Sequence, residues 1–96
     1  MRDFAGKTAV VTGGASGVGY GLATAFGERG ARVALLDIEP AALEAAAKRL
    51  ADAGVEARPF RVDVTDREAM AATAGEVMEA FGHIHILCNN AGVGTG

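Results

Sequence analysis

The chain has 96 residues, of which 50% are hydrophobic and 22% are charged, so it has the size of one small domain and is too apolar for intrinsic disorder. Nine Lys and Arg residues against twelve Asp and Glu residues give a formal charge of −3, which argues against nucleic acid and anionic membranes as partners. A single cysteine, no apolar run of ~18 residues and no signal-peptide core at the start predict a soluble, cytoplasmic protein without an internal disulfide.

Strand-like and helix-like segments alternate along the chain. Short hydrophobic runs predict strands at 7–12, 32–37, 55–62 and 84–89. Arg58 and Pro59 interrupt the third run, which indicates a strand at the edge of a sheet. Apolar residues at helical spacing predict three helices, over 17–29, from Pro40 to just before Gly54, and from Thr65 to just before Gly82.

Each predicted helix has one face that is expected to pack on the core. In chain order, the residues expected on these faces are Val18, Leu22, Ala25 and Phe26; then Leu43, Ala46, Ala47 and Leu50; and then Met70, Ala74, Val77 and Phe81. Thr65 and Glu68 have the spacing of a capping box, which predicts the start of the third helix.

This order of elements predicts an α/β fold in one domain over 1–96, the N-terminal half of a Rossmann-type, doubly wound parallel sheet with strand order 3-2-1-4. The first two helices are expected on one face of the sheet and the third on the other. Ligands of such sheets bind at the carboxyl ends of the strands where the winding reverses, here between the first and fourth strands. Thr12 and Gly13 are therefore expected beside Asn89 and Asn90.

Glycines spaced G-x-x-x-G-x-G follow the first predicted strand, at Gly13, Gly17 and Gly19. They let the backbone turn tightly and let a pyrophosphate approach without meeting a Cβ, while the free N–H groups of the following helix face the anion. The alternative is a glycine turn that only packs the strand against the helix. The position between a strand and a helix favours phosphate binding.

Asp37 ends the second predicted strand, 18 residues beyond Gly19. This is close to the ~20-residue offset at which an acid binds the adenosine ribose of a dinucleotide. Its carboxylate would repel a 2′-phosphate, and neither Ser16 nor Ile38 is basic, so NAD is favoured over NADP. The alternative is a carboxylate that caps the second helix near Pro40.

Two further polar segments follow the later strands. Asp63 and Val64 are suited to the adenine end of such a ligand, or simply lead into the helix that begins near Thr65. The sequence Asn-Asn-Ala-Gly at 89–92 offers amide groups and small side chains beside a ribose or nicotinamide, and is equally compatible with an ordinary turn.

Together, Thr-Gly-x-x-x-Gly-x-Gly at 12–19, Asp37, Asp63-Val64 and Asn-Asn-Ala-Gly at 89–92 resemble the short-chain dehydrogenase/reductase family over the whole chain. The resemblance implies an NAD(P)-dependent oxidoreductase that moves a hydride between the nicotinamide and a carbonyl or alcohol. It implies that Thr12 and Asn89 join the first and fourth strands. The cofactor-binding residues that it implies are Gly13, Ser16, Gly17, Val18 and Gly19 in the glycine loop, Asp37 and Ile38 at the adenosine ribose, Asp63 and Val64 at adenine, and Asn90, Ala91 and Gly92 beside the cofactor ribose.

The catalytic Ser and Tyr-x-x-x-Lys pair of that family have no counterpart in the chain. Its one tyrosine, Tyr20, is followed four positions later by Thr24 and is expected to be ordinary helix surface or packing. We therefore expect the N-terminal cofactor-binding part of a longer protein, incomplete at its C-terminus and inactive alone. The complete protein is expected to be a homo-oligomer that acts on a small-molecule alcohol or carbonyl compound. The apolar edge at 84–88 predicts that the separated chain is marginally stable or self-associating.

The remaining residues with possible chemistry have simpler interpretations. His83 and His85 are expected to be polar surface residues, and Cys88 a packing residue rather than a reactive thiol. No metal site is expected. The alternative function is a nucleotide-binding or sensor module without hydride transfer. Methyl transfer from S-adenosylmethionine fits poorly, because no acid precedes the glycines at Val11 or Thr12.

Overall fold

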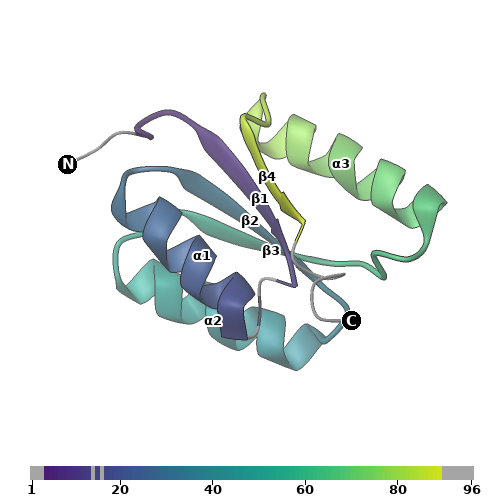
Figure 1. Cartoon of the computed structure of the whole chain (residues 1–96), viewed down its shortest axis with the longest axis horizontal. Helices are drawn as coiled ribbons and strands as arrows, with labels where there is room; N and C mark the ends of the chain where they lie inside the picture. Colours follow the sequence, from purple (N-terminus) through teal and green to yellow (C-terminus); the bar gives the residue numbers. More distant parts are fainter. Residues whose placement is uncertain (1–3, 14, 16, 90–96) are drawn as a thin grey trace.

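The computed structural model describes residues 4–13, 15 and 17–89, which form seven alternating strands and helices (Figure 1). In chain order these are β1 (Thr8–Thr12), α1 (Gly17–Glu28), β2 (Arg32–Asp37), α2 (Pro40–Asp52), β3 (Ala57–Arg61), α3 (Arg67–Phe81) and β4 (Ile86–Asn89). The predicted order of elements is confirmed. The strand β1 begins one residue later than predicted, at Thr8. The strands β3 and β4 are shorter than their hydrophobic runs, because Val55, Val62 and Ile84 pack on the core from positions beyond the strand ends.

The four strands form one parallel sheet with the order β3-β2-β1-β4. The predicted fold class is therefore confirmed, and β3 is an outer strand of the sheet that the described residues form. Pro59, which has no N–H to donate, lies opposite Leu35 of β2. An outer strand tolerates this lost donor because one of its two sides has no ladder to complete.

Helices cover both faces of the sheet, with α1 and α2 on one side and α3 on the other (Figure 1). Successive residues of a strand point to opposite faces, so each strand supplies two cores. Val11, Val33 and Leu35 pack with α1 and α2, whereas Val10 and the alternate residues Ala34 and Leu36 pack with α3. Double coverage explains why the central residues of β1 and β2 form continuous hydrophobic runs and do not alternate with polar residues.

The face of α1 that meets the sheet differs from the predicted one. Gly19, Ala23 and Gly27 are buried, whereas Val18 is 69% exposed. Ala25 is also exposed, and Leu22 and Phe26 pack beside the core only in part. The helix lies close to its neighbours because its inner stripe consists of small residues. A Cβ at Gly27 would lie 2.5 Å from Cγ1 of Val55.

The prediction for α2 is confirmed in both bounds and face. It begins at Pro40, whose missing N–H is tolerated in a first turn, and it ends before Gly54. Its buried residues are the four predicted ones, Leu43, Ala46, Ala47 and Leu50.

The start of α3 corrects the predicted capping box. Asp66 is the N-cap, and its carboxylate accepts the Ala69 N–H at 3.1 Å. The Thr65 hydroxyl instead donates to Asp63 Oδ1, so Thr65 and Glu68 do not cap the helix. An aspartate one position later provides an equally good cap, which the Thr-x-x-Glu spacing concealed.

The buried face of α3 is also partly different from the predicted one. Val77 and Phe81 are buried as expected, and Met70 packs against the same cluster. Ala74 is exposed, and the neighbouring Thr73 takes the buried position.

Polar side chains join the elements at the amino end of the sheet. The Arg32 guanidinium donates to the carbonyl oxygen of Phe81 at 2.9 Å and to Thr8 Oγ1 at 3.3 Å, and it lies 5.2 Å from the centre of the Phe81 ring. His85 is exposed, but its Nδ1 accepts the Thr8 backbone N–H at 3.0 Å. His85 is therefore a surface residue, as expected, that also supports the junction of β1 and β4.

Candidate functional site: the carboxyl ends of the strands

The parallel register brings the carboxyl ends of the four strands to one edge of the sheet. Thr12 lies opposite Leu36 and Asn89, and Asp37 lies opposite Arg61. The strand β1 leads to α1 on one face, whereas α3 on the other face leads into β4, so the winding reverses between β1 and β4 (Figure 1). This is the position at which open α/β sheets bind their ligands.

Gly13 and Ala15 are the described residues between the end of β1 and the start of α1. Gly13 has φ of 64° and Gly17 has φ of 48°, which is the left-handed region that side chains disfavour. Both glycines are therefore required by the backbone itself. Ser16, which the sequence also assigned to the site, lies outside the described residues.

The beginning of α1 presents a positive helix end to the strand tips. Its first turn contains no acidic residue, so no side chain of that turn neutralises the helix dipole. Gly19 is buried on the sheet side, and Val18 is exposed. The N–H groups of a first helical turn have no partner within their own helix, so they are available to an anion.

Asp37 accepts three backbone hydrogen bonds at the end of β2. Its Oδ1 accepts from Ile38 N at 2.7 Å and from Glu39 N at 3.3 Å, and its Oδ2 accepts from Ala15 N at 3.3 Å. Glu39, rather than Asp37, is the N-cap of α2, and it makes no side-chain capping bond. Asp37 therefore does not cap α2 itself, but it does support the turn that leads into this helix.

Asp63 and Val64 follow β3 and lie next to the end of β2, since Val62 N donates to the carbonyl oxygen of Asp37 at 2.9 Å. Asp63 Oδ1 accepts from the Thr65 hydroxyl at 2.6 Å and from Thr65 N at 2.9 Å. These two bonds, the hydroxyl first, hold the pKa of Asp63 below its ordinary value. Asp63 thus forms the turn into α3 and keeps a fully exposed carboxylate.

Thr12 joins the two strands at the reversal point. Its hydroxyl lies 3.1 Å from Asn89 Oδ1 and 3.2 Å from the carbonyl oxygen of Cys88. This is the joining role that the sequence suggested for Thr12 and Asn89. The three following residues of the predicted site, Asn90, Ala91 and Gly92, lie outside the described residues.

Comparison of the sequence with models of known protein families identifies the family of the chain. The family model described as short chain dehydrogenase matches residues 7–96. The chain belongs to the short-chain dehydrogenase family.

Individual relatives agree with this assignment. The C alpha-dehydrogenase of Sphingobium sp. (strain NBRC 103272 / SYK-6) is 42% identical over 99% of this chain, which corresponds to 32% of the relative. A metagenomic short-chain oxidoreductase, solved in complex with NADP, is 39% identical with a TM-score of 0.88, over 94% of this chain and 41% of that one. A short-chain dehydrogenase/reductase from Burkholderia phymatum, solved in complex with NAD, is 37% identical with a TM-score of 0.85, over 91% of this chain and 31% of that one. This short-chain dehydrogenase sequence spans about a third of the length of the curated relatives that it matches.

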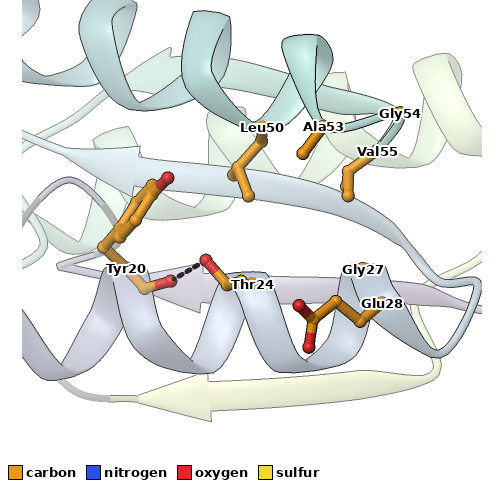
Figure 2. A pocket seen from close by; sticks show the side chains of 8 residues that line it. All are labelled: Tyr20, Thr24, Gly27, Glu28, Leu50, Ala53, Gly54 and Val55. Atoms are coloured by element: carbon orange, nitrogen blue, oxygen red, sulfur yellow. Dashed lines mark hydrogen bonds between the residues drawn. The ribbon is translucent and has the colours of Figure 1, made fainter.

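A cavity of about 280 Å³ in this short-chain dehydrogenase chain lies away from the strand tips, between α1 and the end of α2 (Figure 2). It is lined by Tyr20, Thr24 and Glu28 from α1 and by residues around Val55. The Thr24 hydroxyl donates to the Tyr20 carbonyl oxygen at 2.9 Å, and the Arg49 guanidinium lies 4.7 Å from the centre of the Tyr20 ring. Tyr20 is therefore a packing residue between two helices, as the sequence suggested.

Cys88 of the short-chain dehydrogenase chain is a free, half-buried thiol on β4, and its burial raises its pKa. A raised pKa lowers the thiolate fraction, which agrees with a packing role. Within 4–13, 15 and 17–89, no three His, Cys, Asp or Glu side chains could hold a metal ion together. In the same part of the chain, no helix is long and apolar enough to cross a membrane.

Proposed function

We propose that the chain is the cofactor-binding part of an NAD(P)-dependent short-chain oxidoreductase. The observation that carries the proposal is the contact between the glycine loop and the acid, in which Ala15 N donates to Asp37 Oδ2 at 3.3 Å. It joins the two features that a dinucleotide requires, a glycine-rich loop for the pyrophosphate and a carboxylate for the adenosine ribose. Family membership and relatives solved with NAD or NADP support the same conclusion.

The described residues fit such a cofactor. Gly13 and Gly17 turn the backbone without a Cβ in the approach to the helix end, and the half-buried Asp37 is an acceptor for ribose hydroxyls. The residues proposed to hold the cofactor are Gly13, Ser16, Gly17, Val18 and Gly19 at the pyrophosphate side, Asp37 and Ile38 at the adenosine ribose, Asp63 and Val64 at adenine, and Asn90, Ala91 and Gly92 at the second ribose.

The side chains favour NAD over NADP. Asp37 would repel a 2′-phosphate, and neither Ser16 nor the 47% exposed Ile38 offers a positive charge to neutralise one. When bound, the nicotinamide supplies the chemistry by accepting or giving a hydride, with a small-molecule alcohol or carbonyl compound as the substrate class. This chain binds and orients the cofactor, and we expect it to show no turnover alone.

The Asp37→Ala variant tests the proposal. Loss of a charged acceptor is expected to weaken NAD binding by about 1.5–3 kcal/mol, or roughly 10-fold to 100-fold, and to reduce the preference for NAD over NADP. Isothermal titration calorimetry with each cofactor measures both effects.

Glu39→Ala is the matched control for this titration. Glu39 is an exposed acid two positions further on, and its side chain makes no capping bond. It should leave both affinities unchanged. If Asp37→Ala kept the ratio of NAD affinity to NADP affinity of the unmodified chain, the proposed role of this acid would be contradicted.

A further inference from the structure

The Asp37 carboxylate connects two segments that are distant in sequence. Its Oδ1 bonds to Ile38 N and Glu39 N are local and close the turn that follows β2. Its Oδ2 bond to Ala15 N spans 22 residues and reaches the middle of the loop between β1 and α1. The two oxygens of one side chain therefore have separate partners.

The loop between β1 and α1 is rich in glycine, so ordering it is costly. Ala15 lies between Gly13 and Gly17, and glycine loses more backbone freedom on ordering than any other residue. The Ala15 side chain packs beside the core under α1 and α2, so the bond to Asp37 is the second contact that holds this residue. The bond is partly buried, and its acceptor is charged, which strengthens it relative to a neutral bond in water.

We propose that Asp37 is a positioning residue for the glycine loop, in addition to its role at the ribose. Through Ala15 N, the carboxylate that is proposed to bind the adenosine sugar also fixes the loop that is proposed to receive the pyrophosphate. The link to the cofactor rests on the proposed function, whereas the anchoring of the loop rests on the hydrogen bond alone. A substitution at Asp37 that alters cofactor preference therefore also loosens the phosphate loop.

The Asp37→Asn variant separates the hydrogen bonds of Oδ1 from the hydrogen bond of Oδ2. Asparagine retains one carbonyl oxygen, which can still close the turn at Ile38 and Glu39, as asparagine commonly does. Its NH₂ group then faces Ala15 N, and two donors cannot bond to each other. The Asp37→Ala variant removes both sets of bonds.

Amide hydrogen exchange measured by NMR on the ¹⁵N-labelled chain tests the proposal. In Asp37→Asn, the Ala15 amide is expected to exchange about tenfold faster, while Ile38 and Glu39 keep the rates of the unmodified chain. In Asp37→Ala, all three amides are expected to exchange faster. Retained protection of Val10 and Leu35, in β1 and β2, shows that the sheet is intact.

Asp63→Asn is the matched control, because Asp63 is a carboxylate at another strand tip that closes its own turn at Thr65. It should leave Ala15 exchange unchanged. Unchanged Ala15 exchange in Asp37→Asn would overturn the proposal.

An NAD titration of the two Asp37 variants distinguishes this inference from the proposed function. Lost NAD binding with unchanged Ala15 exchange would overturn the anchoring role and leave the cofactor role standing. Faster Ala15 exchange with undiminished NAD binding would support the anchoring role and contradict the cofactor role.

Discussion

Asp63 shows how one neighbouring residue lowers the pKa of a carboxyl group at a strand tip. The Thr65 hydroxyl and the Thr65 N–H both donate to its Oδ1, and they lower its pKa from the ordinary value of 3.8 against a small opposing effect of desolvation. The folded-state pKa thus lies below the unfolded one. The bonded carboxylate therefore stabilises the fold above pH 3.8 and loses this contribution as the pH falls through the folded-state pKa.

Thr65→Val is expected to raise the pKa of Asp63 toward 3.8. The substitution removes the hydroxyl, which is the larger cause, and retains the backbone N–H, so the pKa should remain below 3.8. NMR titration of the Asp63 carboxyl carbon measures the change. Thr24→Val, which removes a hydroxyl bonded within α1, is the control and should leave this titration unaltered. An Asp63 titration identical in Thr65→Val and the unmodified chain would show that the hydroxyl is not the cause.

The sequence predicted where the polar residues of the candidate site lie better than it predicted their hydrogen-bond partners. Asp37 and Asp63 were identifiable because each stands at the end of a hydrophobic run, and strand ends share an edge of the sheet. The contact of Asp37 with Ala15 depends on the register of β1 and β2, which spacing along the chain does not contain. The bond from Thr8 N to His85 Nδ1 was missed for the same reason, and a histidine at the start of a strand gives no signal for it.

At the scale of the element, α1 packs through small residues. Gly27 meets Val55 so closely that a Cβ would lie 2.5 Å from Cγ1 and 2.7 Å from Cγ2. Val55 is 8% exposed and β-branched, so it cannot rotate away freely. The distance between α1 and the segment before β3 is therefore set by the absence of a side chain at position 27.

Gly27→Ala is expected to destabilise the chain by about 1–2 kcal/mol, because overpacking outweighs the gain in helix propensity. Urea unfolding followed by circular dichroism measures the change. Adding Val55→Ala should restore part of the loss, since it removes the two methyl groups that clash.

Gly21→Ala is the matched control for this helix. Gly21 is exposed on α1, and a Cβ added there would meet no other atom within 4 Å, so alanine should stabilise the helix by about 0.5–1 kcal/mol. Equal effects of the substitutions at 21 and 27 would show that the contact with Val55 does not limit packing.

The three helices differ in how well their faces could be predicted. The face of α2 was correct because two leucines mark it and all four of its residues are buried. The face of α1 was wrong because the pattern weighted Val18 and Ala25 over the glycines, whereas close approach selects the smallest residues. In α3 the error was one position in the middle of the face, where Thr73 rather than Ala74 is buried.

At the scale of the whole molecule, β4 is the second outer strand of the sheet formed by the described residues, and it carries exposed apolar surface. Leu87 is 64% exposed, and only α3 covers this face of the sheet. An outer strand with free N–H and C=O groups and apolar side chains favours association between copies.

The separated chain is therefore expected to be marginally stable or to self-associate in dilute buffer. Sedimentation velocity at several protein concentrations measures the association, and Leu87→Lys should weaken it by placing a charge on the strand. Met78→Lys, which charges a 43% exposed residue on α3, is the control for a general effect of charge. A monomer with a cooperative thermal transition at all concentrations would contradict this expectation.

The parallel sheet was predictable from the order of elements, and its strand order from the Rossmann-type winding. Alternating strands and helices require parallel pairing through right-handed crossovers, and a helix on the opposite face places β4 beside β1. Strand length was less predictable, because Val55 and Val62 are buried without belonging to β3. A residue can be buried without being part of a strand. The hydrophobic pattern of the sequence indicates which residues are buried, and not where a strand ends.

The contacts of Arg32 give the two ends of the sheet different tasks. At one end, a single guanidinium holds the last turn of α3 to Thr8, and His85 adds a bond across the neighbouring strand. These bonds tie β1, β2, β4 and the end of α3 together at the edge of the sheet that lies away from the proposed cofactor site.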